Sequence, residues 1–306
     1  MSAPTSQITI AIAGATGNLG ALITKAFLNL HPESVGRVLI LTRNLDGEKA
    51  KVLEGLGARL VKLDGPIQAG ALKGVDVLVN SLSGGNVPAE TSDSLVKEAV
   101  ASGVKVYFPS EFGMDHRNGP QNHVWFHEKA RHVAAARNIA QGHLQVIQLY
   151  IGMFTEVIFG PFFGLDTKSG VYTSLGSGTA DKEVSITSTA DIAAAVARLA
   201  IIAVADPTSV PDQVRITGDN RSFNELADIV GSEVGKKITV VEEPVAQTSD
   251  QPDGEDLGAL ARLLRLNFAD GAVDFSKNDN ELVNPGQKFW KWKTVRDHAR
   301  DVIAKQ

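Results

Sequence analysis

The stretch ITIAIAGATGNLG, residues 8–20, joins a strand-like apolar run to three closely spaced glycines. Apolar residues then recur at helical spacing over residues 18–30, so the glycines stand where a strand gives way to a helix. In such a corner Gly14 permits the tight turn, Gly17 lets the backbone approach a pyrophosphate, and Gly20 lets the helix pack closely on the sheet. The free N–H groups and the dipole of the helix attract an anion. The stretch therefore predicts a phosphate-binding turn.

Strand-like and helix-like segments alternate from this turn to about residue 150. Strands are expected over residues 8–13, 37–42, 58–63, 75–80, 104–109 and 144–149. Helices are expected near residues 18–30, 46–56, 88–102 and 122–140, with a short helical turn near 67–73. Because the strands are continuously apolar, both of their faces should be covered, and the helices between them imply right-handed parallel crossovers. The pattern predicts an α/β fold, a doubly wound parallel sheet of the Rossmann type.

The end of the second strand indicates which dinucleotide the turn binds. An NAD site usually carries an Asp or Glu there for the ribose 2′-hydroxyl, whereas a nearby Arg accommodates the 2′-phosphate of NADP. The strand ends LILTRN, which puts Arg43 in the place of the carboxylate. The sequence therefore favours NADPH as the cofactor. The alternative is that Arg43 is a solvated loop charge.

The rhythm of the sequence changes after residue 150, where loops and short strands precede several helices. One helix is expected to be capped near Thr189, and Ser222 with Glu225 has the spacing of a capping box. We expect residues 1–150 to form an NADP-binding Rossmann domain and residues 151–306 a smaller, mostly helical substrate-binding region. The boundary stays open, because chains of this kind commonly re-enter the sheet.

Composition narrows the class of protein further. The 306 residues are 43% hydrophobic, and 30 Lys+Arg against 35 Asp+Glu give a net charge of −5. No basic run is present, which argues against a nucleic-acid partner. The sequence has no cysteine, so disulfides and thiolate chemistry are excluded. The apolar stretch 192–205 is too short to cross a membrane and contains Arg198. We expect a cytoplasmic protein without a membrane partner, monomeric or homodimeric.

The usual catalytic pair of short-chain dehydrogenases is absent. Those enzymes use a Tyr followed four residues later by a Lys, and none of the three tyrosines here has a Lys at that spacing. His123, His127 and His132 cluster near one helix, but without a His-Glu-x-x-His motif we interpret them as a polar helix face and predict no metal site. An aromatic set suits either an apolar pocket or core packing: Phe154, Phe159, Phe162 and Phe163.

The segment VYFPSEFGMDHR, residues 106–117, makes a family resemblance specific. Together with GATGNLG, LTRN and HEKARHVAAARNIA, it resembles the isoflavone reductase-like branch of the atypical short-chain dehydrogenases. That branch includes the phenylcoumaran benzylic ether, isoflavone and pinoresinol–lariciresinol reductases of secondary metabolism, and it borders the NmrA-like regulatory proteins of fungi. The likeness covers nearly the whole chain and is strongest over residues 8–155.

The resemblance implies a role for each residue that matches a family position. The implied phosphate turn consists of Gly14, Thr16, Gly17, Asn18, Leu19 and Gly20, with Arg43 as the 2′-phosphate ligand. The implied contacts to the ribose and nicotinamide come from Asn80, Ser81, Ser110 and Glu111. Lys129 matches the catalytic lysine. The implied substrate positions are Phe112, Met153 and Phe154. Plant reductases commonly have an Asn before paired aromatics where this chain has Gly152, a departure that resembles the fungal relatives.

The expected activity is hydride transfer from NADPH to a small aromatic, enone or quinone-type metabolite. Lys129 should lie on a helix that flanks the cleft where dinucleotide-binding sheets hold their ligands. The pKa of a desolvated lysine shifts readily, so this residue can stabilise and protonate a developing oxyanion as a general acid/base. The alternative is a redox-sensing regulator that binds NADP(H) and reduces nothing.

Overall fold

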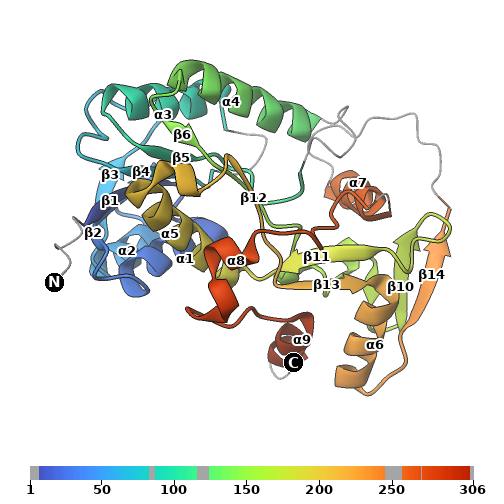
Figure 1. Ribbon diagram of the computed structural model, residues 1–306. Helices are drawn as coiled ribbons and strands as arrows, with labels where there is room; N and C mark the ends of the chain where they lie inside the picture. The colour runs from blue at the N-terminus through green and yellow to red at the C-terminus, as the bar shows by residue number, and fades with distance from the viewer. Residues whose placement is uncertain (1–6, 83–86, 116–123, 245–256, 270, 304–306) are drawn as a thin grey trace. The chain divides into compact units, whose positions relative to one another are not determined.

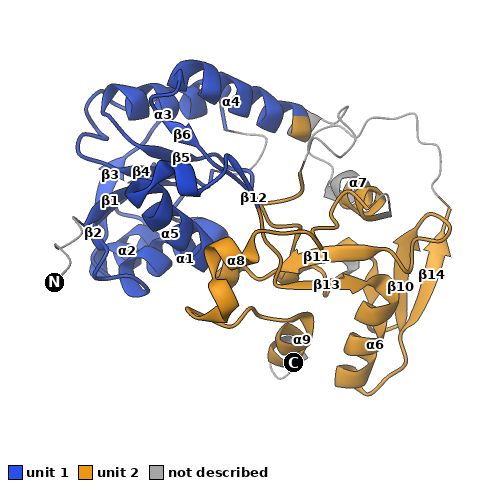
Figure 2. Cartoon of the chain, in the orientation of Figure 1, with its two compact units in different colours: residues 1–111, 127–149, 192–214 blue, residues 112–126, 150–191, 215–306 orange. Residues whose placement is uncertain are grey.

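The computed structural model describes residues 7–82, 87–115, 124–244, 257–269 and 271–303. The chain divides into two compact units, shown in blue and orange in Figure 2. The first unit contains residues 1–111, 127–149 and 192–214, and the second contains residues 112–126, 150–191 and 215–306. The chain therefore re-enters the first unit after residue 191. The assignment of cofactor binding to residues 1–150 and of substrate binding to residues 151–306 stays a prediction.

The first unit is built on a six-stranded sheet in the order β3-β2-β1-β4-β5-β6, all of whose pairs are parallel. Its strands are β1 Ile8–Ala13, β2 Val35–Thr42, β3 Arg59–Lys62, β4 Val77–Asn80, β5 Val106–Phe108 and β6 Gln145–Val146. The strand order reverses between β1 and β4, so the switch point lies directly after the first strand, where ligands bind in such sheets. The predicted doubly wound sheet is confirmed.

The strand expected over residues 144–149 is divided in the structure. After β6 the chain leaves the edge of the sheet, and the amide of Gln148 donates to the carbonyl oxygen of Asp212 at 2.9 Å. Strand β7, Gln148–Tyr150, thereby pairs with β12, Gln213–Arg215. The apolar pattern of the sequence was continuous across this point, so the change of partner strand left no signal in it.

Helices cover both faces of the sheet (Figure 1). The helices with residues in the first unit are α1 Asn18–Asn29, α2 Glu48–Gly55, α3 Ala89–Ala101, α4 Val124–Ala140 and α5 Thr189–Ala205. Helices α3 and α4 lie on one face, and α1 and α2 on the other. The core under α3 and α4 joins small and branched side chains of helices and strands, among them Ala11, Leu39, Leu78, Leu95, Ala99, Ala136 and Ala140. The aromatic ring of Tyr107 lies in the same core.

The second unit combines helices with two small sheets, in the orders β14-β10-β9 and β13-β11-β8. Its strands are β8 Met153–Phe154, β9 Leu165–Asp166, β10 Val171–Leu175, β11 Glu183–Thr187, β13 Asp219–Ser222 and β14 Thr239–Glu243. Its α-helices are α6 Phe223–Val234, α7 Leu257–Ala269, α8 Asn280–Val283 and α9 Val295–Ile303. Phe163 is buried in the core of this unit and stacks on Phe268 with ring centroids 5.5 Å apart, which is the packing role considered for that residue.

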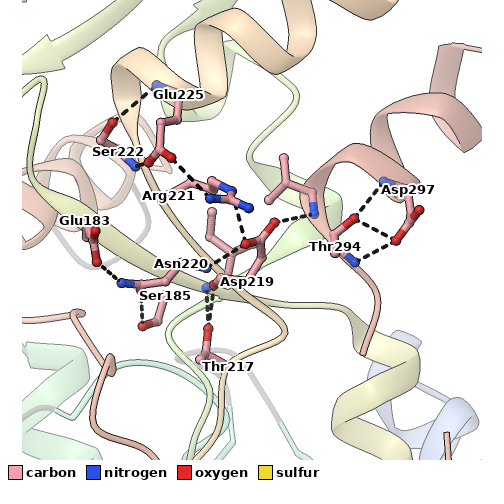
Figure 3. Close-up of polar contacts among 12 residues, drawn as sticks. Glu183, Ser185, Thr217, Asp219, Asn220, Arg221, Ser222, Glu225, Thr294 and Asp297 are labelled. Carbon is pink, nitrogen blue, oxygen red and sulfur yellow. Dashed lines mark hydrogen bonds and ion pairs between the residues drawn. The ribbon is translucent and has the colours of Figure 1, made fainter. Parts of the chain in front are cut away.

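In the second unit the starts of α6 and α9 are fixed by hydrogen bonds from side chains (Figure 3). Ser222 Oγ accepts from the amide of Glu225 at 3.2 Å, and the Glu225 carboxylate accepts from the amide of Ser222 at 2.9 Å, so the predicted capping box of α6 is confirmed. At the start of α9, Thr294 and Asp297 exchange the equivalent pair of bonds.

The cap expected near Thr189 is Ser188. The amide of Asp191 donates to Ser188 Oγ at 3.1 Å, while the Thr189 hydroxyl donates to Glu156 at 2.7 Å. A cap precedes the first helical residue, and α5 already begins at Thr189, so Ser188 takes the position. No described helix is both long enough and apolar enough to span a bilayer.

Candidate cofactor and active site

The turn between β1 and α1 requires glycine at two positions. Gly14 has φ +80°, and a β-carbon there would lie 2.7 Å from the carbonyl carbon and oxygen of Ser81. At Gly20 a β-carbon would overlap the carbonyl oxygen of Gly14. A side chain on Gly14 would push the turn away from the end of β4, and a side chain on Gly20 would push it away from α1. The glycine spacing therefore holds three pieces of backbone in close contact.

The start of α1 offers N–H groups that have no hydrogen-bond partner among the described residues. Gly17 is the N-cap residue and supplies no side-chain cap, and the first turn has no acidic residue. Ala21 is the first residue whose amide bonds back to the Gly17 carbonyl, at 3.0 Å, so the amides of Asn18, Leu19 and Gly20 precede the helical ladder. By contrast, α6 closes its own start with a capping box. The uncapped N-terminus of α1 suits an anion such as a pyrophosphate.

Arg43 follows directly after β2 and is exposed. Within the described part of the chain its guanidinium makes no hydrogen bond or ion pair, so it is available to an anion. Its carbonyl oxygen accepts from Lys62 Nζ at 2.6 Å. Lys62 ends the neighbouring strand β3, where it pairs in register with Thr42. No motif in the sequence indicates this second cation, because it reaches Arg43 only through the pairing of two parallel strands.

The end of β4 is tied to the glycine turn. The amide and the hydroxyl of Ser81 both donate to the carbonyl oxygen of Ala13, at 2.9 and 2.8 Å. The Asn80 side chain is buried and engaged internally, since its Nδ2 donates to the Tyr107 hydroxyl at 3.1 Å and its Oδ1 accepts from the amide of Leu82, also at 3.1 Å. Asn80 and Ser81 thus lie beside the glycine turn, and their side chains hydrogen bond to the backbone there.

Lys129 lies on helix α4, and its side chain reaches the turn that follows β5. Its Nζ donates to the carbonyl oxygen of Glu111 at 2.6 Å, although 18 residues separate the two in sequence. Burial lowers the pKa of the Lys129 ammonium, and the nearby Glu111 carboxylate partly opposes that shift. The Glu111 side chain is itself only 1% exposed, and Ser110 beside it is half-buried. The structure thus brings Ser110, Glu111 and Lys129 together.

The expected substrate residues belong to the second unit. Phe112 is buried, Met153 is 6% exposed within the hydrophobic core, and Phe154 is half-buried. Strand β8, which carries Met153 and Phe154, pairs with β11. Gly152 before it has φ +67°, and a β-carbon there would overlap the carbonyl oxygen of Ser185. This close approach explains a glycine at that position without reference to a substrate. The substrate role of the three side chains stays a prediction.

The histidines interpreted as a polar helix face differ from one another. His123 lies outside the described residues, and His127 is exposed. His132 is buried, at 8% exposed, and its ring is hydrogen bonded on both nitrogens, so the prediction of a polar face is wrong for this residue. It lies on the side of α4 that faces the sheet, where Tyr107 provides a polar partner.

The strand order and the glycine turn at the switch point define the class: this is a Rossmann-type α/β protein with a glycine-rich turn after its first strand. Within that class the chain belongs to the NmrA-like family, whose model matches residues 6–295.

Curated relatives agree with this placement, and a solved structure shares the fold. The chain is 29% identical over 236 residues to an NmrA-like family domain-containing oxidoreductase of Gibberella moniliformis, covering 72% of this chain and 75% of the relative. It is 34% identical over 117 residues to phenylcoumaran benzylic ether reductase PT1 of Pinus taeda, covering 36% of this chain and 37% of the relative. The solved structure of AtPrR2 with NADP+ and (+)pinoresinol shares the fold, with a TM-score of 0.77, 20% identity and coverage of 97% of this chain and 99% of that one.

Proposed function

We propose that the protein is an NADPH-dependent reductase of a small aromatic, enone or quinone-type metabolite, with Lys129 as its general acid/base. The observation that carries the proposal is the position of Lys129, whose half-buried Nζ is held on the Glu111 carbonyl in the turn after β5. Carboxyl ends of parallel strands are where ligands bind in such sheets. The reductases among the relatives support the same class of activity.

The described residues fit NADPH. The uncapped start of α1 would hold the pyrophosphate, and the missing side chain of its N-cap residue Gly17 would let the phosphate approach the backbone. Arg43, with Lys62 beside it, would pair with the 2′-phosphate, which a plain NADH lacks. When bound, the cofactor supplies a hydride, and everything else in the reaction is left to the chain's own side chains.

Lys129 has the donors that a reduction needs. One of its three N–H bonds is used on Glu111, so two remain for an oxygen of the substrate. As the hydride forms a new C–H bond, the ammonium holds the negative charge that develops on that oxygen and then transfers a proton to it. The neutral amine regains its proton from water. A lowered pKa brings the two forms of the side chain closer in free energy near neutral pH, which suits proton transfer.

The test measures NADPH binding and NADPH oxidation separately. In Lys129→Met, binding should persist within about threefold while turnover on a panel of aromatic ethers, enones and quinones falls by roughly 10²–10⁴-fold. Lys129→Arg is the matched control, because it keeps the charge but cannot release a proton near neutral pH. It should also lose turnover. Normal turnover in either variant contradicts the assignment, and binding without turnover in the wild type would favour the redox-sensing alternative.

A further inference from the structure

Four buried or half-buried side chains from four elements of the first unit form one continuous line of hydrogen bonds. Asn80 Nδ2 at the end of β4 bonds to the Tyr107 hydroxyl of β5 at 3.1 Å. That hydroxyl lies 2.7 Å from His132 Nε2 on α4. His132 Nδ1 lies 3.2 Å from Asp93 Oδ1 on α3. The proposed reaction does not use Tyr107, His132 or Asp93. Because these polar groups are buried or half-buried, placing them there costs free energy unless they are hydrogen bonded.

The chemistry of the two ends fixes the direction of every bond. The Asp93 carboxylate can only accept, so His132 carries its proton on Nδ1 and presents a bare Nε2. That nitrogen must accept from the Tyr107 hydroxyl, which then has only lone pairs to offer to Asn80. The Asn80 amide must therefore point its Nδ2 at the phenol and its Oδ1 at the amide of Leu82, at 3.1 Å.

The far end of the line is anchored at Asp93. Arg131 Nη1 lies 3.1 Å from Asp93 Oδ2, so the second carboxylate oxygen is also engaged and the group is held in place. His132 is flanked by Asp93 on α3, by Arg131 on its own helix, and by Tyr107 and Glu111 from β5 and the turn after it. Burial lowers the pKa of His132, which keeps the ring neutral as the bonding direction requires.

The near end of the line holds the turn 80–82, which also touches the phosphate turn. Ser81 binds the carbonyl of Ala13 twice, and its backbone carbonyl stands where a side chain on Gly14 would collide with it. Residues 80–82 are thus held on one side by the glycine turn between β1 and α1. On the other side they are held by the buried hydrogen bonds that begin at Asn80. A shift of the Asn80 amide would move backbone that lies directly against the proposed cofactor-binding loop.

We infer that Tyr107, His132 and Asp93 are positioning residues for the cofactor: they fix the orientation of the Asn80 amide and, through it, the backbone of residues 80–82 beside the phosphate turn. The inference rests on the proposed function for its consequence in NADPH binding. It assigns to Asn80 an indirect role, because both polar atoms of its side chain are used within the protein.

Two substitutions of His132 separate this role from a merely structural one. In His132→Gln the terminal amide reaches the place of Nε2, so its oxygen can accept from Tyr107. In His132→Asn the amide reaches only the place of Nδ1, so it can donate to Asp93 but leaves the phenol without its acceptor. Both variants lose the imidazole ring and its packing contacts. Only His132→Gln keeps an acceptor for the Tyr107 hydroxyl and so keeps the hydrogen bonds directed at Asn80. Tyr107→Phe breaks the line at its centre and serves as the second variant should His132→Asn not fold.

Three measurements apply to these proteins. In the cofactor-free wild type, imidazole ¹⁵N shifts should identify His132 as the Nδ1–H tautomer. Exchange of the Leu82 amide hydrogen should stay within about threefold in His132→Gln and rise roughly tenfold or more in His132→Asn and Tyr107→Phe, as the loss of one neutral hydrogen bond predicts. The Kd for NADPH should follow the same order.

An Nε2–H tautomer overturns the inference, as does equal behaviour of the Gln and Asn variants in Leu82 exchange or in NADPH affinity. Should the wild type bind no NADPH, the proposed function fails, and the inferred role in cofactor positioning fails with it. The tautomer and the exchange rates then still show whether the line sets the turn. A Kd that follows only the melting temperature of each variant also contradicts the positioning role.

Discussion

Replacing Gly14 by alanine should remove cofactor binding and destabilise the first unit by more than the backbone conformation alone accounts for. Gly103 offers a matched control, since it has φ +72° and no atom within 4 Å of the place of a β-carbon, whereas Gly14 has φ +80° and three backbone atoms of residues 81 and 82 within 2.7–2.8 Å. An L-residue in the left-handed region costs about 1–2 kcal/mol at either position. At Gly14 overpacking against rigid backbone adds roughly 1–3 kcal/mol.

Urea denaturation should therefore show a loss of about 1–2 kcal/mol for Gly103→Ala and roughly 2–5 kcal/mol for Gly14→Ala. NADPH titration of the two proteins at low temperature, where both are folded, should show normal affinity for the first and none for the second. Equal losses of stability would refute the reasoning, because they would mean that the backbone around Ser81 yields to the added methyl. Normal NADPH affinity in Gly14→Ala would refute the assignment of this turn to the pyrophosphate.

Three further changes test other contacts. Arg43→Ala should weaken NADPH binding by roughly 10–100-fold in calorimetry and leave NADH binding unchanged, since only NADPH offers a 2′-phosphate to the guanidinium. A parallel loss for both cofactors would argue for a solvated loop charge. Burial lowers the pKa of His132 below its usual 6.5, so the unfolded chain binds the proton first as pH falls. Below pH 6.5, His132 should therefore lower the free energy of unfolding by at most about 1.4 kcal/mol per pH unit. This slope should shrink in His132→Gln. Ser222→Ala should lose about 1 kcal/mol of stability in urea denaturation, because the capping box of α6 is lost. Asp115→Ala should lose about 3 kcal/mol, because Arg215 Nη2 lies 2.5 Å from the buried Asp115 carboxylate. Losses below about 0.3 kcal/mol in either variant would contradict these two readings.

Local pattern carried most of the fold. The alternation of apolar strands with helices predicted the sheet, and the glycine spacing predicted the turn after β1, because both depend on residues close together in the chain. The same holds for the capping box at Ser222. The division of the last predicted strand could not be read in this way, since it depends on β12, which lies more than 60 residues later.

The candidate site was predictable only where one segment contains it. Arg43 could be placed by its position after the second strand, whereas Lys62 is brought beside it by strand pairing. The role of Lys129 was predicted from family resemblance. Its hydrogen bond to Glu111 joins residues 18 positions apart, so no local pattern indicates it. The line from Asn80 to Asp93 joins residues 25–39 positions apart, and a lone buried His on α4 has no signature in a single sequence.

The interleaving of the two units limits how this protein can be cut and how it is made. Residues 192–214, which include most of helix α5, belong with the first unit, and the side-chain amide of Gln145 in its edge strand β6 donates to the carbonyls of Pro207 and Val210. A truncation after residue 150 would remove this return segment and leave the Gln145 amide without these two acceptors, so the N-terminal half should express as an aggregation-prone fragment. On the ribosome, the first unit cannot be completed until some 214 residues have emerged, by which time residues 150–191 of the second are already outside.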